Sequence, residues 1–300
     1  MRKTYPLLLF ILIAFSCSES DAILKTNNTI AGKQPIKVIN ALDPTKLAKI
    51  IYFPGTAYES QWFFYSNGLL KKITKQDGTV VQNFIYDANK NLTFTSHIGS
   101  AGNAAISYSF TYDNSNHITS CNGQPVTYDA IANKYIYQYI PINDYDYPDN
   151  REIILTSDLL ITSEVTNYIA IDGNYSMGGM SAGYFNNNMS FVIGYSDPSG
   201  PSYQYDEKVN PLKLAMLPIC RAMSITSGSY TSRFATGEYN SVNNVILNGY
   251  GPEDPEKEEY VYEYNSNNIP RSIQQKFYYL NVLESTRLFA LYYYQGDVIP

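Results

Sequence analysis

The sequence is short of the residue types on which metal binding and much catalysis rest. It has 3 cysteines and 2 histidines in 300 residues. His97 and His117 have no second histidine, cysteine or paired carboxylate at the spacing of a zinc site, so no metal ion is expected. The P-loop, the dinucleotide-binding fingerprint and the Gly-x-Ser-x-Gly elbow are also absent from the sequence. We therefore predict no catalytic, cofactor-binding or metal-binding residue, and no cofactor.

Charge is scarce as well. Charged residues make up 16% of the chain, against about 25% in an average globular protein. The 21 basic and 27 acidic residues give a formal net charge of −6, which provides no positive surface for a phosphate backbone. Nucleic acid is therefore not expected as a partner. Disorder is not expected either, because the 15% aromatic content supplies far more buriable area than disordered chains carry.

The apolar run near the start is too short for a membrane-spanning helix. Residues 7–15 are apolar and follow Arg2 and Lys3, whereas a spanning helix needs roughly 20 such residues. A short apolar run behind positive charges is typical of a secretory signal peptide. The segment ends at Cys17, and residues 14–17 resemble a bacterial lipoprotein signal, in which the chain is cleaved before the cysteine and the cysteine is lipidated.

This resemblance implies a cellular address and a domain plan. It makes residues 1–16 a lipoprotein signal peptide, Cys17 the lipid attachment site and the membrane a partner through that anchor. The acidic segment after Cys17 is similar to that of Bacteroidetes-type lipoproteins on the outer face of the outer membrane, so an outer-membrane, surface-exposed lipoprotein is expected. The alternative is an ordinary signal peptide with Cys17 unmodified. Residues 17–35 are polar and predict a flexible tether, and residues 36–300 predict a single domain.

Two further cysteines lie in that domain. Cys121 and Cys220 are 99 positions apart, a separation that does not fix their distance in space. Outside the cytoplasm they could form one disulfide, and the other possibility is a pair of buried thiols.

Tyrosine, in contrast, is abundant, with 30 copies. Aromatic rings occupy every second position of several segments, and such alternation places them on one face of an extended strand. Residues with turn chemistry, Asp, Asn, Ser and Gly, follow directly. The pattern predicts a mostly β protein with little helix: an antiparallel meander of Tyr-rich hairpins that forms a curved open sheet or a partly closed barrel-like shell. The alternating segments are residues 108–112, 135–139, 260–264 and 292–294.

Helix is expected in two places only. Residues 211–223 have a proline at a start position and an apolar pattern after it, with Pro218 as an early break. Residues 46–51 predict one or two helical turns. The Gly-rich residues 173–188 predict a loop or a strand with a close backbone approach.

Short sequence phrases built around Tyr-Asp or Tyr-Asn recur along the chain and resemble those of a known family. Residues 84–92 resemble the YD repeats of Rhs-type shells, and more closely those of uncharacterised YD-repeat-containing lipoproteins of Bacteroidetes, which have no established biochemical activity. Those lipoproteins share a Tyr-Asp-x-Lys-x-Asn-Pro-Leu/Phe-Lys phrase, which residues 205–213 match. Residues 243–245 and 264–270 match two further phrases. The Arg-Tyr and Gly-Arg-Leu of true Rhs shells are missing.

These observations leave several functions open. The first is an envelope lipoprotein that acts as a non-enzymatic binding or structural scaffold, with a glycan or another envelope protein as its partner. The second is a glycan-binding accessory lipoprotein of an outer-membrane uptake system, in which Trp62, Tyr108 and Tyr112 would form an aromatic binding face. The other explanation is that the tyrosines cover a sheet face that is partly exposed to solvent, with their rings packed and their hydroxyls in water.

The remaining functions are less favoured by the sequence. A carboxylate-dependent hydrolase would need two buried carboxylates about 5–10 Å apart in one cleft. A membrane-embedded porin is not favoured, because its outward strand positions are apolar, whereas the rings of residues 108–112 alternate with Ser and Thr.

Overall fold

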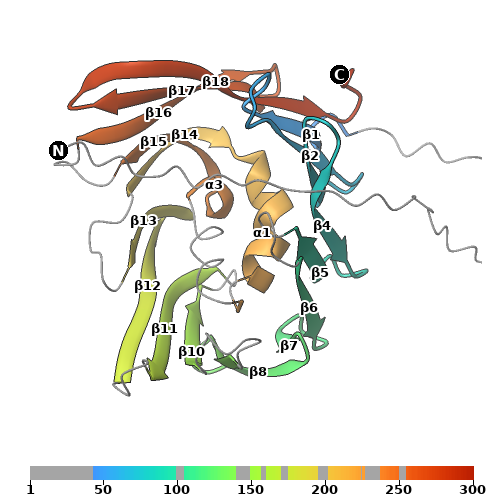
Figure 1. Cartoon of the computed structure of the whole chain (residues 1–300), viewed down its shortest axis with the longest axis vertical. Coiled ribbons are helices and arrows are strands. Elements are labelled where there is room, and N and C mark those ends of the chain that lie inside the picture. Colours follow the sequence, from blue (N-terminus) through green and yellow to red (C-terminus); the bar gives the residue numbers. More distant parts are fainter. Residues whose placement is uncertain are drawn as a thin grey trace, which may run out of the picture.

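The computed structural model describes residues 43–98, 105–139, 149–156, 160–169, 175–194, 202–223, 225–226, 237–249 and 255–300. Eighteen strands and two helices lie in these ranges (Figure 1). They are β1 (Leu47–Tyr52), β2 (Ser60–Phe64), β3 (Leu70–Lys75), β4 (Val80–Tyr86), β5 (Leu92–His97), β6 (Ile106–Tyr112), β7 (Ile118–Cys121), β8 (Gln124–Asp129), β9 (Lys134–Tyr139), β10 (Asp149–Leu155), β11 (Ile161–Ile169), β12 (Tyr175–Phe185), β13 (Asn188–Gly194), β14 (Ser202–Val209), α1 (Pro211–Met223), α3 (Gly237–Asn240), β15 (Asn243–Gly249), β16 (Glu256–Tyr264), β17 (Pro270–Tyr279) and β18 (Val282–Tyr294).

The strands form one closed antiparallel barrel. Each strand from β1 to β18 pairs with its neighbours in the sequence, and β1 also pairs with β18, from Leu47 opposite Tyr294 to Tyr52 opposite Ala290. This last pairing joins the two ends of the meander. The predicted antiparallel meander is confirmed, and of the two predicted shapes the barrel-like one is correct.

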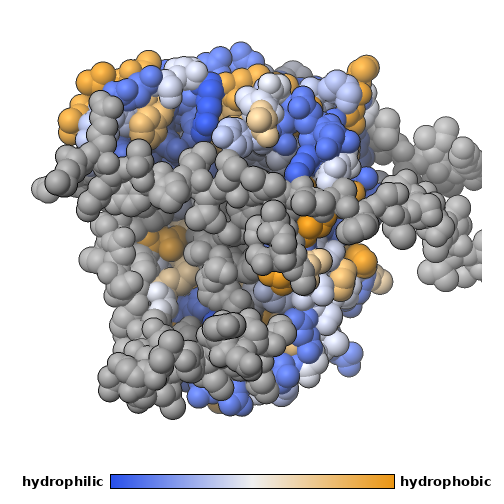
Figure 2. Space-filling model, in the orientation of Figure 1, coloured by the Kyte–Doolittle hydropathy of each residue, from blue (hydrophilic) through white to orange (hydrophobic). Residues whose placement is uncertain are grey.

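The alternating rings point into the barrel. In β6, Phe110 is only 4% exposed, and Tyr108 and Tyr112 pack against the core. Ser109 and Thr111, between them, are exposed. Figure 2 shows hydrophilic residues spread over the outer surface among scattered hydrophobic ones. The period of two therefore separates an apolar interior from a mixed, largely polar exterior.

A helix fills the middle of the barrel. The ring of strands surrounds α1 (Figure 1), and Met216, Ile219 and Met223 of this helix are fully buried. Side chains alone can fill a barrel of about eight strands, and a wider barrel leaves a central space, which α1 occupies here. The helix predicted at residues 211–223 is confirmed, but the early break expected at Pro218 is wrong, because α1 continues through this proline to Met223. Within the described ranges, no helix is long and apolar enough to cross a membrane.

Asn210 fixes the start of this helix. Its side-chain Oδ1 accepts the backbone N–H of Leu212 at 3.0 Å, as an N-cap does. Its Nδ2 donates to the backbone carbonyl of Glu238 in α3 at 2.7 Å, and Pro211 occupies the first helical position. The Asn-Pro of residues 205–213 therefore starts α1 and ties it to α3.

The helical turns predicted for residues 46–51 are wrong. Residues 47–51 belong to β1, which is hydrogen-bonded to β18 on one side and to β2 on the other. Five of the six residues of β1 are buried. Pairing with strands distant in the sequence outweighs the local preference here.

The Gly-rich segment forms a strand with a close backbone approach, as one of its two alternatives predicts. Gly179 of β12 has a φ of +149°, and a Cβ at this position would lie 1.9 Å from the carbonyl oxygen of Glu164 in β11. Only glycine fits so close to the neighbouring strand.

The aspartate or asparagine after the repeat tyrosine builds the turn. In β6–β7, Asp113 Oδ1 accepts the backbone N–H groups of Ser115 and His117 at 2.8 and 2.9 Å. Asn116 adopts a left-handed φ of 65°, a conformation that asparagine tolerates. Asn265 makes the same pair of contacts in the β16–β17 turn. The repeat is therefore a strand followed by a side-chain-capped turn.

Tyrosine hydroxyls add hydrogen bonds between neighbouring strands. At or near the ends of several strands, a tyrosine hydroxyl donates to a backbone carbonyl of the neighbouring strand, while the ring stays in the core. The bonds are Tyr86 to Leu70 (2.8 Å), Tyr112 to Leu92 (2.7 Å), Tyr262 to Val245 (2.9 Å) and Tyr294 to Pro270 (2.8 Å). Burial raises the pKa of each of these phenols, so the hydroxyl stays protonated and able to donate.

We expect Tyr112→Phe to lower the free energy of unfolding by about 0.5–1.5 kcal/mol, because the ring still packs but the Leu92 carbonyl loses its donor. Urea unfolding measures this loss. Tyr58→Phe is the matched control, because Tyr58 is 57% exposed and should change stability little. Equal effects of the two substitutions would contradict the role of the buried hydroxyl.

Both cysteines of the domain are free. Cys121 of β7 and Cys220 of α1 are buried in the core, which is the second of the two alternatives. Burial raises the pKa of both thiols to about 12, so neither is a reactive thiolate near neutral pH.

Candidate functional site

The aromatic residues singled out in the sequence lie on the inner side of the barrel. Trp62 packs against Tyr52 and Tyr239, with ring centroids 5.1 and 6.1 Å apart. Tyr108 and Tyr112 also pack against the core. These three rings do not form an exposed binding face, because the barrel uses its alternating rings to fill the interior. Cys17 lies outside the described residues.

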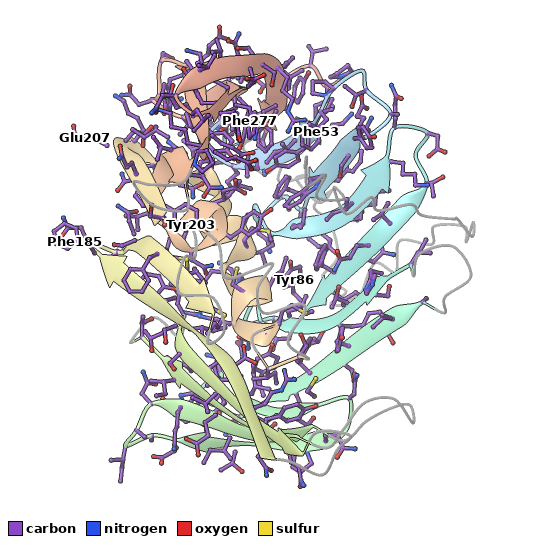
Figure 3. The ribbon with its side chains drawn as sticks, turned by 60° about the vertical axis from the view of Figure 1, so that its left-hand side comes forward. Phe53, Tyr86, Phe185, Tyr203, Glu207 and Phe277 are labelled. Carbon is purple, nitrogen blue, oxygen red and sulfur yellow. The ribbon has the colours of Figure 1, made fainter. Side chains whose placement is uncertain are left out.

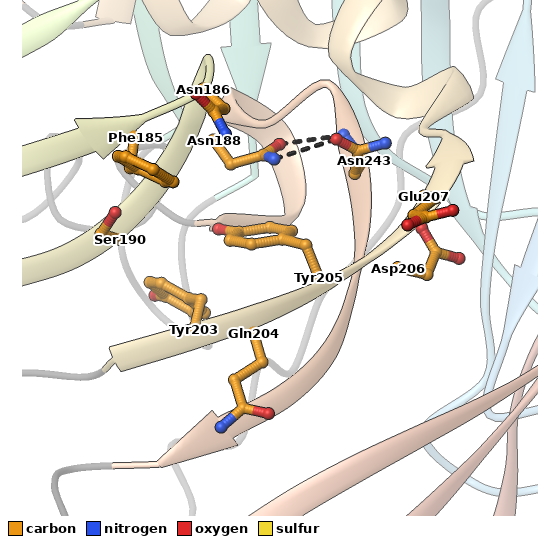
Figure 4. A pocket seen from close by; sticks show the side chains of 10 residues that line it. All are labelled: Phe185, Asn186, Asn188, Ser190, Tyr203, Gln204, Tyr205, Asp206, Glu207 and Asn243. Atoms are coloured by element: carbon orange, nitrogen blue, oxygen red, sulfur yellow. Dashed lines mark hydrogen bonds between the residues drawn. The ribbon is translucent and has the colours of Figure 1, made fainter.

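The barrel wall is weakest between β13 and β14. Among the described residues, these strands share one pair in the ladder, Phe191 opposite Ser202. Residues 241–243 partner the edge of β13 in place of β14: the N–H of Met189 donates to Ser241 Oγ at 2.9 Å. Asn188 and Asn243 join the two segments by two hydrogen bonds of 2.9 and 3.0 Å (Figure 4).

A pocket of about 460 Å³ lies where β13 and β14 separate, and we call it the seam pocket. It is lined by the turn between β12 and β13, by β14 and by the start of β15 (Figure 4). Its volume lies within the range of about 300–1,000 Å³ that small-molecule sites have. The seam pocket is therefore the candidate site.

Aromatic rings gather at the seam pocket. Figure 4 shows Phe185, Tyr203 and Tyr205 on the same side of β14, and the two tyrosine rings have centroids 6.4 Å apart. Phe185 is 71% exposed and projects outward from the barrel (Figure 3). It precedes a two-residue turn of Asn186 and Asn187, which both have positive φ, the geometry of a tight hairpin. This turn holds Phe185 at the rim.

Contacts with neighbouring segments fix Tyr203 and Tyr205 in place. The Tyr205 hydroxyl donates to the Met189 carbonyl and accepts a hydrogen bond from Ser241 Oγ at 2.8 Å. A Cβ at Gly237 would lie 2.8 Å from the ring of Tyr203, so only glycine lets α3 approach this closely. The inner wall of the seam pocket is thus fixed by the fold.

Asp206 has a structural role beside the seam pocket. Its carboxylate accepts the backbone N–H groups of Lys208 at 2.9 Å and Asn244 at 3.1 Å. The hydroxyl of Tyr264 donates to the same carboxylate. The Tyr-Asp of residues 205–213 therefore ties β14 to β15 and β16.

Of the other polar side chains that line the seam pocket, only Glu207 is charged. No hydrogen bond within the described part of the chain engages the side chains of Asn186, Ser190, Gln204 or Glu207. The described residues that line the seam pocket include no lysine, arginine or histidine. Within the described ranges, no group of three His, Cys, Asp or Glu residues is placed to hold a metal ion. The site therefore offers rings, hydroxyls and amides, and one rim carboxylate.

A pair of acidic residues lies elsewhere, in the wall and interior of the barrel. Burial, and then the charge of Glu258 in β16, raise the pKa of Glu238 in α3 to about 7. Glu258 in turn accepts a hydrogen bond from the Tyr260 hydroxyl at 2.7 Å. Neither carboxylate lines the seam pocket.

Sequence reasoning missed the seam pocket, although two signals point toward it. The run of three asparagines after Phe185 marks a tight turn, and residues 205–213 form the phrase shared with the lipoproteins described above. What the sequence does not show is that the turn and the phrase meet at one gap in the wall.

Comparison with known proteins adds little. No family model matches the chain, and no curated protein sequence matches it significantly. Among solved structures, a porin-like protein from Bacteroides uniformis is 12% identical with a TM-score of 0.40, over 84% of this chain and 98% of the other. A porin-like protein from Bacteroides vulgatus is 13% identical with a TM-score of 0.32, over 84% and 99%. At scores this low the likeness carries no argument about function.

Proposed function

We propose that this chain is a lipid-anchored protein of the cell envelope that acts as a non-enzymatic binding scaffold and uses the seam pocket as its binding site. The observation that carries the proposal is the filled barrel. The central helix α1 and the inward rings occupy the interior, so the function we propose depends on the outer surface and the wall of the barrel and not on a central channel.

The outer surface supports this proposal. Outward positions of β6 are Ser and Thr, and those of β16 include an exposed Glu263 beside an exposed Val261. The outward face of a membrane-embedded barrel is instead an apolar band. A barrel with an apolar interior and such an exterior suits an aqueous compartment, and membrane attachment would then come from lipid at Cys17.

The outer-membrane address and surface exposure are part of the same proposal. They rest on the lipoprotein-like residues 14–17 and on the acidic segment that follows them. Residues 17–35 would give the barrel a flexible polar connection to the membrane.

We expect a fatty-acid label to be incorporated into the wild-type chain and lost in Cys17→Ala. Expression in a bacterium with a lipoprotein pathway, with an alkyne-tagged fatty acid in the medium, measures this directly. Cys121→Ala is the matched control, because its thiol is buried and its substitution should leave the label in place. Label retained by Cys17→Ala would refute the anchor.

The same labelled protein tests the filled barrel. Reconstituted in a planar bilayer, it should give no conductance steps, since its interior is occupied. Reproducible single-channel steps would contradict the scaffold and favour a pore.

A further inference from the structure

We propose that the seam pocket binds a neutral carbohydrate, with a sugar ring laid against Phe185 and Tyr203 and its hydroxyls bonded to the free polar side chains around them. This inference rests on the proposed function, in which the seam pocket is the binding site, and adds the class of ligand.

The rings supply the apolar half of such a site. A sugar has an apolar face of C–H groups, which packs on an aromatic ring as other apolar surfaces do. Phe185 is 71% exposed, and leaving a ring of this size in water costs free energy that a bound ligand would recover. Tyr203 lies on the same side of β14 (Figure 4) and is backed by Gly237. The two rings are therefore placed before the ligand arrives, which lowers the entropic cost of binding.

The polar side chains supply the other half. Asn186 carries an amide with two donors and an acceptor, and Ser190 carries a hydroxyl, whereas Gln204 projects from the opposite side of β14 (Figure 4). Neither Asn186 nor Ser190 is engaged by its side chain in a hydrogen bond within the described part of the chain. Sugar hydroxyls both donate and accept, so amides and hydroxyls match them, whereas a purely apolar ligand would leave these groups unpaired.

The charges exclude one class of ligand and limit another. Anionic ligands need a cation, and no lysine, arginine or histidine is among the described lining residues. A cationic ligand would need free carboxylates. Asp206 is already engaged by two backbone N–H groups and the Tyr264 hydroxyl, which leaves Glu207 alone at the rim. A single exposed carboxylate contributes little in water, so a neutral ligand fits best.

The experiment is titration calorimetry on the wild-type lipidated chain, kept in a detergent without a sugar headgroup. The probes are neutral hexasaccharides of glucose in α-1,4 and β-1,3 linkage, of mannose, of xylose and of N-acetylglucosamine. We expect at least one to bind, and Phe185→Ala to weaken its binding by about tenfold through loss of the stacked ring. The control Tyr58→Ala removes another exposed aromatic side chain, 57% exposed and outside the pocket, and should leave the affinity unchanged.

A second variant separates a sugar from a cation. Glu207→Gln keeps the shape and removes the charge, so sugar affinity should change by no more than about twofold, whereas binding of a cation would weaken more strongly. Binding of choline in place of every sugar would overturn the proposal. So would the absence of heat with all five probes while circular dichroism shows a folded barrel, or equal sugar binding by wild type and Phe185→Ala.

Failure here is distinguishable from failure of the proposed function. A chain that takes the fatty-acid label at Cys17 but binds no sugar remains an anchored scaffold with another ligand. A chain that binds sugar without the label loses the anchor and keeps the site.

Discussion

Glu164→Ala is expected to lower the free energy of unfolding by about 3–5 kcal/mol, because it removes the carboxylate of a buried ion pair while the guanidinium of Arg151 stays buried. Arg151 Nη1 lies 3.4 Å from Glu164 Oε1, and the two side chains are 5% and 4% exposed. Urea unfolding, followed by circular dichroism and by the fluorescence of Trp62, measures the loss.

The size of this effect follows from what the pair holds. Arg151 also donates to the backbone carbonyl of Thr226 at 2.9 Å, three residues after the end of α1. The pair therefore secures the C-terminal end of the central helix to β10 and β11, as Asn210 secures its N-terminal end. Without Glu164, Arg151 is less firmly fixed between the sheet and the Thr226 carbonyl, and the attachment of the helix end is loosened.

Two variants make the comparison specific. Glu152 lies on the same strand as Arg151 and forms an ion pair with Lys134 of β9, in which the charged atoms are 2.8 Å apart and the side chains are 47% and 21% exposed. Glu152→Ala should therefore lower the free energy of unfolding by less than about 1 kcal/mol. The double variant Arg151→Met with Glu164→Leu removes both buried charges and should be more stable than Glu164→Ala alone. A single substitution as mild as the exposed control would contradict the buried pair.

The fold was predictable to the extent that it depends on local pattern. Alternating rings and the turn residues behind them predicted strands and hairpins, and the Pro at residue 211 predicted the start of α1. The rings of residues 108–112 share the inner face as expected. Closure was not predictable, because β1 pairs with β18 across more than 230 positions of sequence, and no local pattern encodes such a contact.

The candidate site was less predictable, for a related reason. The sequence shows that Trp62, Tyr108 and Tyr112 are aromatic but not which side of the wall they face, and the barrel turns them inward. Phe185 lies at the end of a hairpin, and the gap beside it exists because residues 241–243 take the place of a strand neighbour of β13. A site made by an interrupted ladder depends on tertiary pairing, which short motifs do not specify.

Glu238→Gln is expected to stabilise the protein above neutral pH and to remove a dependence of stability on pH. The pKa of Glu238 rises from 4.5, the ordinary value, to about 7, first through burial and then through the charge of Glu258. The folded state therefore holds a proton that the unfolded state has released between these values. The free energy of unfolding should fall as pH rises from about 4.5 to about 7, and then level off.

The magnitude follows from the same shift. Each unit of pKa is worth about 1.4 kcal/mol, so the ionised carboxylate costs about 3 kcal/mol above pH 7. Glu238→Gln, which is neutral at every pH, should exceed the wild type by about this amount at pH 8 and match it near pH 4.5. Burial, the neighbouring Glu238 charge and the phenol of Tyr52 raise the pKa of the Tyr292 phenol well above its ordinary value of 10, so it stays protonated throughout this range.

Carboxylates on the surface act in a different range. Turn aspartates such as Asp113 and Asp129, whose pKa values are lowered from 3.8 mainly by backbone hydrogen bonds, stabilise the fold above that pH and lose their effect only in stronger acid. Urea unfolding of wild type and Glu238→Gln at steps between pH 4.5 and 8 isolates Glu238, with the exposed Glu284→Gln as the matched control. If Glu238→Gln retains the slope of the wild type, the carboxylate is not enclosed and the acidic pair reaches solvent, as a hydrolase would require.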